Sequence, residues 1–101
     1  LSIDYAKLDY HFTAFIGILL TKSNRTQEVL KELTTIPNVI EASVISGKYN
    51  IFCKIRAKNT EDAKRIIYKI DDIQDVMRTE SMISMEEYIS DKNRLIQAVS
   101  I

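Results

Sequence analysis

The sequence predicts an α+β domain in which four strands and two helices follow one another in the order β-α-β-β-α-β. Apolar residues form strand-sized runs, and between these runs they recur at helical spacing. The 101 residues include only 2 Gly and 1 Pro, which leaves little material for irregular loops. The two halves of the chain also repeat the same apolar pattern. Together these three observations predict one compact domain.

The first half contains a strand, a helix and a second strand. Residues 13–20 are expected to form the first strand, because both of its faces are apolar. Asn24 is then expected to cap a helix, with Gln27 bonding back to the cap. Pro37 stops that helix, because the residue before a proline is pushed towards extended geometry. Residues 39–46 are expected to form the second strand.

The second half begins with a hairpin. Gly47 can supply the positive φ of a tight turn into a third strand over residues 49–57. Asn59 is expected to cap the second helix, and residues 76–88 are expected to form a long fourth strand. Residues 91–101 fit either a terminal strand or a short helix.

An internal duplication supports this order. A shift of 37 residues overlays the apolar positions of one strand, one helix and the next strand. Two βαβ halves give the ferredoxin-like fold, an antiparallel four-stranded sheet with both helices on one face. The overlaid pairs are Phe15 and Phe52, Ile18 and Ile55, Val29 and Ile66, Leu30 and Ile67, Leu33 and Ile70, Ile36 and Ile73, and Val39 and Val76.

The sheet face opposite the helices is expected to be apolar. Because side chains alternate along a strand, Phe15 and Leu19 point away if Ile16 faces the helices, and Phe52 joins them by the overlay. Large exposed apolar patches usually mark an interface. We therefore expect a homodimer formed sheet face to sheet face; the alternative is a few tolerated surface hydrophobic residues.

Charge and composition exclude several classes of protein. Lys and Arg number 14 and Asp and Glu number 14, so the net charge of zero argues against a nucleic-acid-binding module. No apolar run reaches the roughly 18–20 residues of a membrane helix, and no signal peptide is recognisable. We expect a cytoplasmic domain. Because the chain starts with Leu1 instead of Met, we also expect it to be part of a longer protein.

No residue set typical of catalysis or metal binding is present in the sequence. His11 is the only histidine and has no nucleophile or carboxylate at a recognisable spacing. Cys53 is the only cysteine, which excludes an internal disulfide, and its alternation with isoleucines places it in the core. Asp71, Asp72 and Asp75 lack the glycine of a calcium loop and are expected to form a solvated loop. We expect no catalytic residue, no metal and no cofactor.

Four segments at matching spacing resemble a known family. Residues 5–16 resemble the entry into its effector domain, and residues 33–39 its helix-to-strand passage. Residues 46–50 (Ser-Gly-Lys-Tyr-Asn) resemble its G-x-Y-D hairpin, and residues 73–81 its I-x-x-V-x-x-T-x-T strand. The family is the Lrp/AsnC (leucine-responsive/asparagine) family of transcription regulators, and the resemblance covers roughly residues 5–90.

The resemblance implies an effector-sensing domain that forms dimers through its sheets, and whose dimers commonly assemble into rings of eight. It implies that a small ligand, usually an amino acid, binds in a cleft between neighbouring dimers. Asn50 stands where the family usually has Asp, and Ser81 where it has Thr. By motif, the effector-binding residues would be Gly47, Tyr49, Asn50, Thr79 and Ser81.

The resemblance also implies a division of the chain. Residues 1–12 would be the remnant of a strand connecting to an N-terminal helix-turn-helix domain, residues 13–90 the effector-binding and oligomerisation domain, and residues 91–101 a C-terminal segment. DNA binding would then reside only in the missing N-terminal domain. The chain would be either a truncated regulator or a stand-alone sensor.

Three other functions use the same topology. An ACT-like regulatory module of a metabolic enzyme typically has a Gly-rich loop after its first strand, whereas residues 21–24 contain no Gly. A small dimeric α+β-barrel enzyme would need polar catalytic groups in an apolar pocket, and the chain offers only His11 and scattered Tyr. An RNA-recognition module would stack bases on Phe15 and Phe52, but its basic and aromatic sequence pattern is absent.

Overall fold

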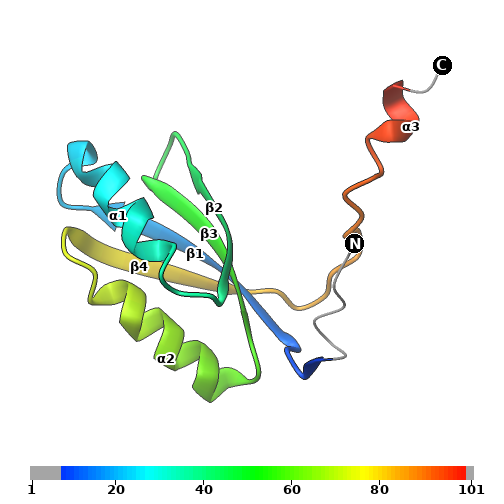
Figure 1. Cartoon of the computed structure of the whole chain (residues 1–101), viewed down its shortest axis with the longest axis horizontal. Helices are drawn as coiled ribbons and strands as arrows, with labels where there is room; N and C mark the ends of the chain where they lie inside the picture. Colours follow the sequence, from blue (N-terminus) through cyan, green and yellow to red (C-terminus); the bar gives the residue numbers. More distant parts are fainter. Residues whose placement is uncertain (1–7, 100–101) are drawn as a thin grey trace.

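The computed structural model describes residues 8–99, and in this part of the chain four strands form one antiparallel sheet. The strand order is β2-β3-β1-β4, and helices α1 and α2 lie side by side on one face of the sheet (Figure 1). The predicted ferredoxin-like fold is confirmed. Its elements are β1 (Phe12–Leu20), η2 (Ser23–Arg25), α1 (Thr26–Leu33), β2 (Val39–Val44), β3 (Ile51–Ala57), α2 (Thr60–Asp71), β4 (Val76–Ile83) and α3 (Ile96–Val99).

The core lies between the sheet and the two helices. The alternating apolar residues of the central strands β1 and β3 point towards the helices and are fully buried, as the sequence pattern predicts. One stripe of each helix packs against them. Burial of each large aliphatic side chain contributes about 1.5–3 kcal/mol. The fully enclosed members are Ile16, Ile18, Ile51, Cys53, Ile55, Val29, Leu33, Ile66 and Ile70.

The predicted duplication is visible in the packing. Overlaid residues of the two halves occupy the same kind of environment, in the core or at its margin. Phe15 and Phe52 lie on neighbouring strands, and their rings stack with centroids 5.8 Å apart. The pairs Ile18 and Ile55, Val29 and Ile66, and Leu33 and Ile70 are buried, whereas Leu30 and Ile67 are half-buried at the edge of the core.

The two helices begin differently. The side chain of Asn59 accepts a hydrogen bond from the Asp62 N–H at 2.9 Å, so the predicted cap of α2 is confirmed. The predicted Asn24 cap is wrong, because Asn24 lies in the 3₁₀ turn η2 and α1 has no side-chain cap. The Thr26 N–H instead donates to the Ser23 carbonyl of that turn, and the Thr26 hydroxyl donates to the same carbonyl at 2.6 Å.

The hairpin between β2 and β3 is longer than predicted. Residues 45–50 form its loop, so β3 begins at Ile51 instead of residue 49 and the turn is not a tight two-residue turn. The Asn50 N–H donates to the Ile18 carbonyl of β1 at 2.9 Å, while the Asn50 carbonyl accepts from the Ile45 N–H across the loop at 3.2 Å. Gly47 has a φ of +117°, as the sequence predicts for a turn glycine.

The fourth strand is shorter than predicted. β4 ends at Ile83 instead of residue 88, and the Ser84 N–H makes the last bond of the edge, to the Thr13 carbonyl at 2.9 Å. β1 begins at Phe12, which the register places opposite Met85, so β1 offers at most one more residue with which the chain beyond Ser84 could pair. Of the two alternatives for residues 91–101, the short helix is found as α3, with residues 100–101 outside the described part. Residues 1–7 of the expected connecting strand also lie outside it.

Candidate functional site

The sheet face opposite the helices, called here the far face, is aromatic at its centre. Phe15 and Phe52 lie on it, and the strand register places Leu19 and Met82 on the same side. The Lys54 ammonium lies 5.8 Å from the centroid of the Phe15 ring. Phe15, Leu19 and Phe52 are therefore on the predicted face, half-buried in the single chain.

Tyr49 covers the part of the far face where β1 has a glycine. A Cβ added to Gly17 would lie 2.8 Å from three carbons of the Tyr49 ring, so the ring rests directly on the backbone. The Tyr49 hydroxyl donates a hydrogen bond to the carboxylate of Glu80, the β4 partner of Gly17. The hairpin is thereby held across β1 onto β4.

The pKa values of this pair reflect their bond. The hydrogen bond from Tyr49, with the Lys48 ammonium 3.9 Å away, lowers the pKa of Glu80 below its ordinary value. The same bond to the carboxylate raises the pKa of Tyr49. At neutral pH the pair therefore holds a charged acceptor and a neutral donor, the stronger combination for a hydrogen bond.

Asn50 uses its side chain to hold the hairpin to β1. Its Oδ1 accepts the Leu20 N–H at 2.9 Å, while its own N–H donates to the Ile18 carbonyl. A carboxylate oxygen could accept the same bond. The amide at this position thus provides an acceptor oxygen where the G-x-Y-D motif has a carboxylate.

Gly47 lies at the open end of the hairpin. It is exposed, and a Cβ added to it would meet nothing within 4 Å. The positive φ, and not lack of space, therefore explains the glycine. A turn of this kind leaves backbone N–H groups accessible to an anionic group such as a carboxylate.

Thr79 and Ser81 lie on the other side of the sheet. They pair with Ile18 and Ile16, whose side chains face the helices. The Thr79 hydroxyl donates to Asp71 Oδ1 at 2.7 Å, at the end of α2. One chain therefore brings Gly47, Tyr49 and Asn50 together and separates them from the two hydroxyl residues. β4 is an edge strand, so a second chain can approach it.

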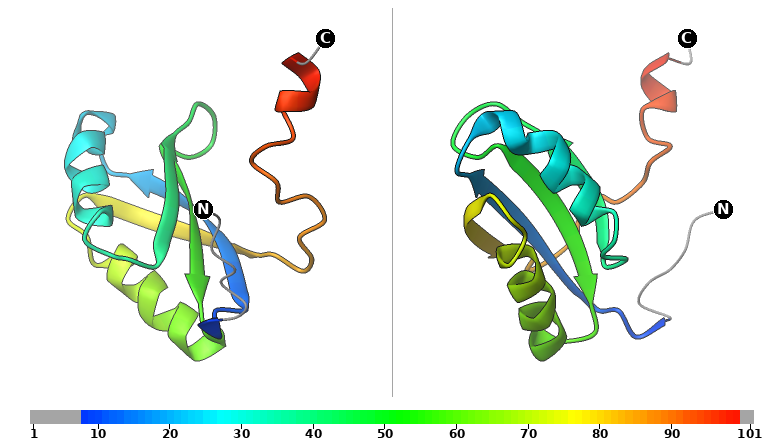
Figure 2. Two further views of the ribbon diagram at one scale, coloured as in Figure 1. Left: turned by 45° about the vertical axis from the view of Figure 1, so that its right-hand side comes forward. Right: turned by 60° about the vertical axis from the view of Figure 1, so that its left-hand side comes forward.

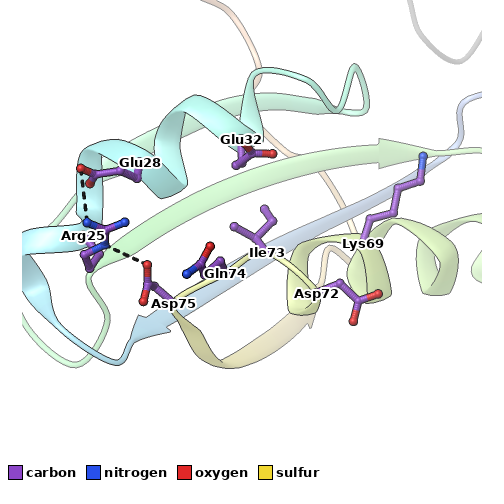
Figure 3. A pocket seen from close by; sticks show the side chains of 8 residues that line it. All are labelled: Arg25, Glu28, Glu32, Lys69, Asp72, Ile73, Gln74 and Asp75. Atoms are coloured by element: carbon purple, nitrogen blue, oxygen red, sulfur yellow. Dashed lines mark hydrogen bonds and ion pairs between the residues drawn. The ribbon is translucent and has the colours of Figure 1, made fainter.

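A groove of about 430 Å³ lies between α1 and the connection from α2 to β4 (Figure 3). Arg25 Nε is 2.9 Å from Asp75 Oδ2, and Arg25 Nη1 is 3.8 Å from Glu28 Oε1. Figure 3 shows the guanidinium between these two carboxylates. The predicted effector-binding residues are not among those that line the groove, which are Arg25, Glu28, Glu32, Lys69, Asp72, Ile73, Gln74 and Asp75.

The structure places the remaining chemistry-bearing residues as follows. His11 is exposed, 3.8 Å from Asp9. Cys53 is enclosed in the core, where burial raises the pKa of its thiol to about 12. Within residues 8–99, no three His, Cys, Asp or Glu side chains are grouped so that they could hold a metal ion. No helix in this range is long and apolar enough to span a membrane.

Sequence reasoning missed Gly17 and Glu80, which complete the hairpin contact. Gly17 interrupts an otherwise apolar strand, and such a glycine often marks a close approach by another group. Glu80 had no sequence signal, because its partner Tyr49 is 31 residues away.

The βαββαβ ferredoxin-like fold serves many unrelated functions, so the fold alone defines only the class of domain. Residues 13–94 match the family described as Lrp/AsnC ligand binding domain. The chain therefore belongs to the Lrp/AsnC family.

Several named regulators are similar to this chain. It is 34% identical over 88 residues to Regulatory protein AsnC of Haemophilus influenzae. This alignment covers 86% of this chain and 59% of the length of that protein. It is 30% identical over 84 residues to Regulatory protein AsnC of Escherichia coli K12, and this alignment covers 82% of this chain and 55% of that protein. The chain thus spans less than two thirds of the length of these relatives.

Solved structures agree with the fold. The structure of E. coli AsnC superposes with a TM-score of 0.85 at 27% identity, covering 90% of this chain and 62% of that one. A feast or famine regulatory protein of Mycobacterium tuberculosis, solved with L-methionine, has a TM-score of 0.81 at 18% identity, covering 91% and 62%. TTHA0845 of Thermus thermophilus has a TM-score of 0.71 at 26% identity, covering 78% of this chain and 99% of that one.

Proposed function

We propose that this chain is the amino-acid-sensing and oligomerisation domain of an Lrp/AsnC-type transcriptional regulator, and that it is not an enzyme. The match of residues 13–94 to the family's ligand-binding domain is the observation on which the proposal rests. The relatives are named as transcriptional regulators, which supports a regulatory role in the cytoplasm. DNA would be bound by a separate domain of such a regulator.

The proposed effector site combines two chains. Backbone N–H groups near Gly47 would bind the carboxylate of an amino acid, with Tyr49 and Asn50 holding the hairpin in place. The hydroxyls of Thr79 and Ser81 would accept hydrogen bonds from its ammonium group. Because these hydroxyls lie on the opposite face of the sheet from Tyr49, the hairpin of one chain would face β4 of a neighbouring chain.

The proposed assembly begins with a homodimer through Phe15, Leu19 and Phe52. Ion pairs surround these residues, with Lys54 Nζ 4.0 Å from Glu41 Oε2 and Arg56 Nη2 2.8 Å from Glu87 Oε1. Paired charges at the rim let two identical faces approach without net repulsion. Such dimers would assemble further into a ring, for example of eight chains.

The sensing proposal is tested by thermal-shift measurements on the full chain against each of the twenty amino acids. A ligand at 100 times its Kd stabilises the protein by about 2.7 kcal/mol, which is measurable as a raised Tm. We expect at least one amino acid to raise the Tm. Thr79→Ala and Ser81→Ala should abolish that shift, whereas Thr60→Ala, an exposed threonine on α2, should keep it. If no amino acid raises the Tm, the sensing proposal is wrong.

The assembly proposal is tested by sedimentation equilibrium at micromolar concentration. We expect a dimer or a multiple of dimers for the full chain, and a monomer for Phe52→Glu, which places a charge on the apolar centre of the far face. Glu28→Gln on the helix side should leave the assembly unchanged. A monomeric full chain would contradict the proposal.

A further inference from the structure

The chain leaves the domain after β4. Residues 84–99, called here the C-terminal arm, run away from the sheet and end in α3, apart from α1 and α2 in every view (Figures 1 and 2). The match to the family's ligand-binding domain extends only to residue 94. The match thus ends within the arm, and none of the proposed effector-binding residues lies in the arm, so the effector site does not explain its role.

The base of the arm is fixed on the far face. Glu87 Oε1 lies 2.8 Å from Arg56 Nη2 and accepts a hydrogen bond from the Thr13 hydroxyl at 3.2 Å. Thr13 and Arg56 are direct partners in the sheet, on the same face as Phe15. Glu87 covers Thr13, which is only 5% exposed. The rest of the arm thus departs from the face that the proposed dimer uses, and not from the helix side.

The large apolar side chains of the arm are exposed in the single chain. They are between 58% and 92% exposed. Leu95, directly before α3, and Ile96 and Val99 within it recur at helical spacing, so they fall on one side of this segment. A concentrated run of this kind marks an interaction surface. Its members are Met85, Tyr88, Ile89, Leu95, Ile96 and Val99.

The far face alone offers little apolar area for a stable dimer. A whole aromatic side chain buries about 150–250 Å², and Phe15 and Phe52 are already half-buried by their stacking and by Lys54. Their exposed parts therefore supply only part of the roughly 800 Å² of total surface, polar and apolar together, that a stable interface buries on each partner. The arm begins at this face and can supply the missing area.

We propose that the C-terminal arm packs against a second copy of this chain and continues the far-face interface, so that the two copies exchange arms. The proposal rests on the homodimer proposed above. A second copy on the far face would lie beside the arm where the arm leaves Glu87. The arm's own domain offers no equivalent surface, because the partner covers its far face and its helices lie on the other side (Figure 2).

Sedimentation equilibrium on the full chain tests the contribution of the arm. Replacing Leu95, Ile96 and Val99 together by Ser should raise the dimer dissociation constant roughly tenfold or more. The matched control replaces the polar arm residues Lys92 and Gln97 by Ser and should leave it unchanged. If the apolar variant dimerises as well as the control, the arm proposal is wrong, while loss of the dimer in Phe52→Glu would still support the far face. A monomeric full chain would overturn both.

A spin label distinguishes exchange from folding back. The label is attached to Gln97→Cys; Cys53 is buried in the core and does not compete for it. Labelled chains are mixed with ¹⁵N-labelled chains that carry no spin label. Exchange predicts paramagnetic broadening of amide signals in the ¹⁵N-labelled copy. In a second sample the spin-labelled chains are themselves ¹⁵N-labelled and are diluted with unlabelled chains. Broadening in that sample, with none in the first, would mean that the arm folds onto its own domain and would overturn the proposal.

Discussion

The ring of Tyr49 rests on the backbone of Gly17, and this contact joins the hairpin to the centre of the sheet. The Cγ, Cδ1 and Cδ2 atoms of the ring would all lie 2.8 Å from a Cβ at Gly17, too close for any other residue without a shift. The hydroxyl at the far end of the ring is bonded to Glu80 on the next strand. The ring is thus held between β1 and β4. Any movement of the hairpin is therefore coupled to the edge strand that carries Thr79 and Ser81.

Gly17→Ala is predicted to destabilise the domain by about 1–3 kcal/mol, because the added methyl group overlaps the Tyr49 ring. The same substitution in a Tyr49→Ala background should be neutral or stabilising, since alanine suits a strand better than glycine once the space is free. Urea denaturation of the two single variants and the double variant measures this reversal of sign. Additive free energies would show that the ring does not press on the strand.

The contact between Tyr49 and Glu80 is predicted to weaken in acid. The folded-state pKa of Glu80 lies below its ordinary value of 4.5, because Tyr49 donates to the carboxylate and Lys48 lies nearby. The stabilisation that the charged Glu80 carboxylate contributes is therefore complete above pH 4.5. It is lost as the pH falls through the lower pKa of Glu80 in the folded state. The Tm of the native chain should fall more steeply below pH 4.5 than that of Tyr49→Phe. Parallel Tm curves for the two proteins would contradict this assignment.

Asn50→Asp is predicted to be tolerated, whereas Asn50→Ala should cost about 1–3 kcal/mol. Asn50 Oδ1 accepts the N–H of Leu20, which is buried, and alanine would leave that donor without a partner. Aspartate keeps an acceptor oxygen at the same place. Denaturant titration of both variants measures the difference. Equal losses of stability would mean that the amide, and not the acceptor, is needed.

The architecture could be predicted from the sequence because its signals are local or periodic. Alternation placed Phe15 and Phe52 on the far face, and the spacing of Asn59 before a helical stripe identified a cap that exists. Asn24 carried the same local signal and failed, because the chain makes a 3₁₀ turn there and satisfies its N–H groups with backbone carbonyls. A cap is thus decided by the geometry of the preceding connection as much as by the capping residue.

The candidate site was less predictable because its contacts join distant parts of the chain. The length of β4 depends on where β1 begins, and the partner of Tyr49 lies on another strand. Register also decides the separation of the motif residues: Thr79 pairs with Ile18 on the helix side, while Tyr49 lies over Gly17 on the far face. A motif recognised residue by residue does not show on which face of a sheet each member falls.

The thiol of Cys53 is predicted to make the protein less stable in alkali. Burial raises its folded-state pKa from 9.0 to about 12. Below pH 9 both the folded and the unfolded chain keep the proton, so the thiol has no effect there. Between pH 9 and 12 only the unfolded chain loses it, and the free energy of unfolding should fall by up to about 1.4 kcal/mol per pH unit.

Cys53→Val is the matched variant for this prediction, because it keeps an apolar side chain in the same place and removes the titrating group. The lysines and tyrosines titrate in both proteins, so the difference between their pH profiles isolates the thiol. Between pH 8 and pH 10, the free energy of unfolding should fall further for the native chain than for the variant. At pH 8 a thiol reagent should modify Cys53 only as fast as the domain opens, and rapid modification of the folded protein would show that the core around β3 is open to solvent.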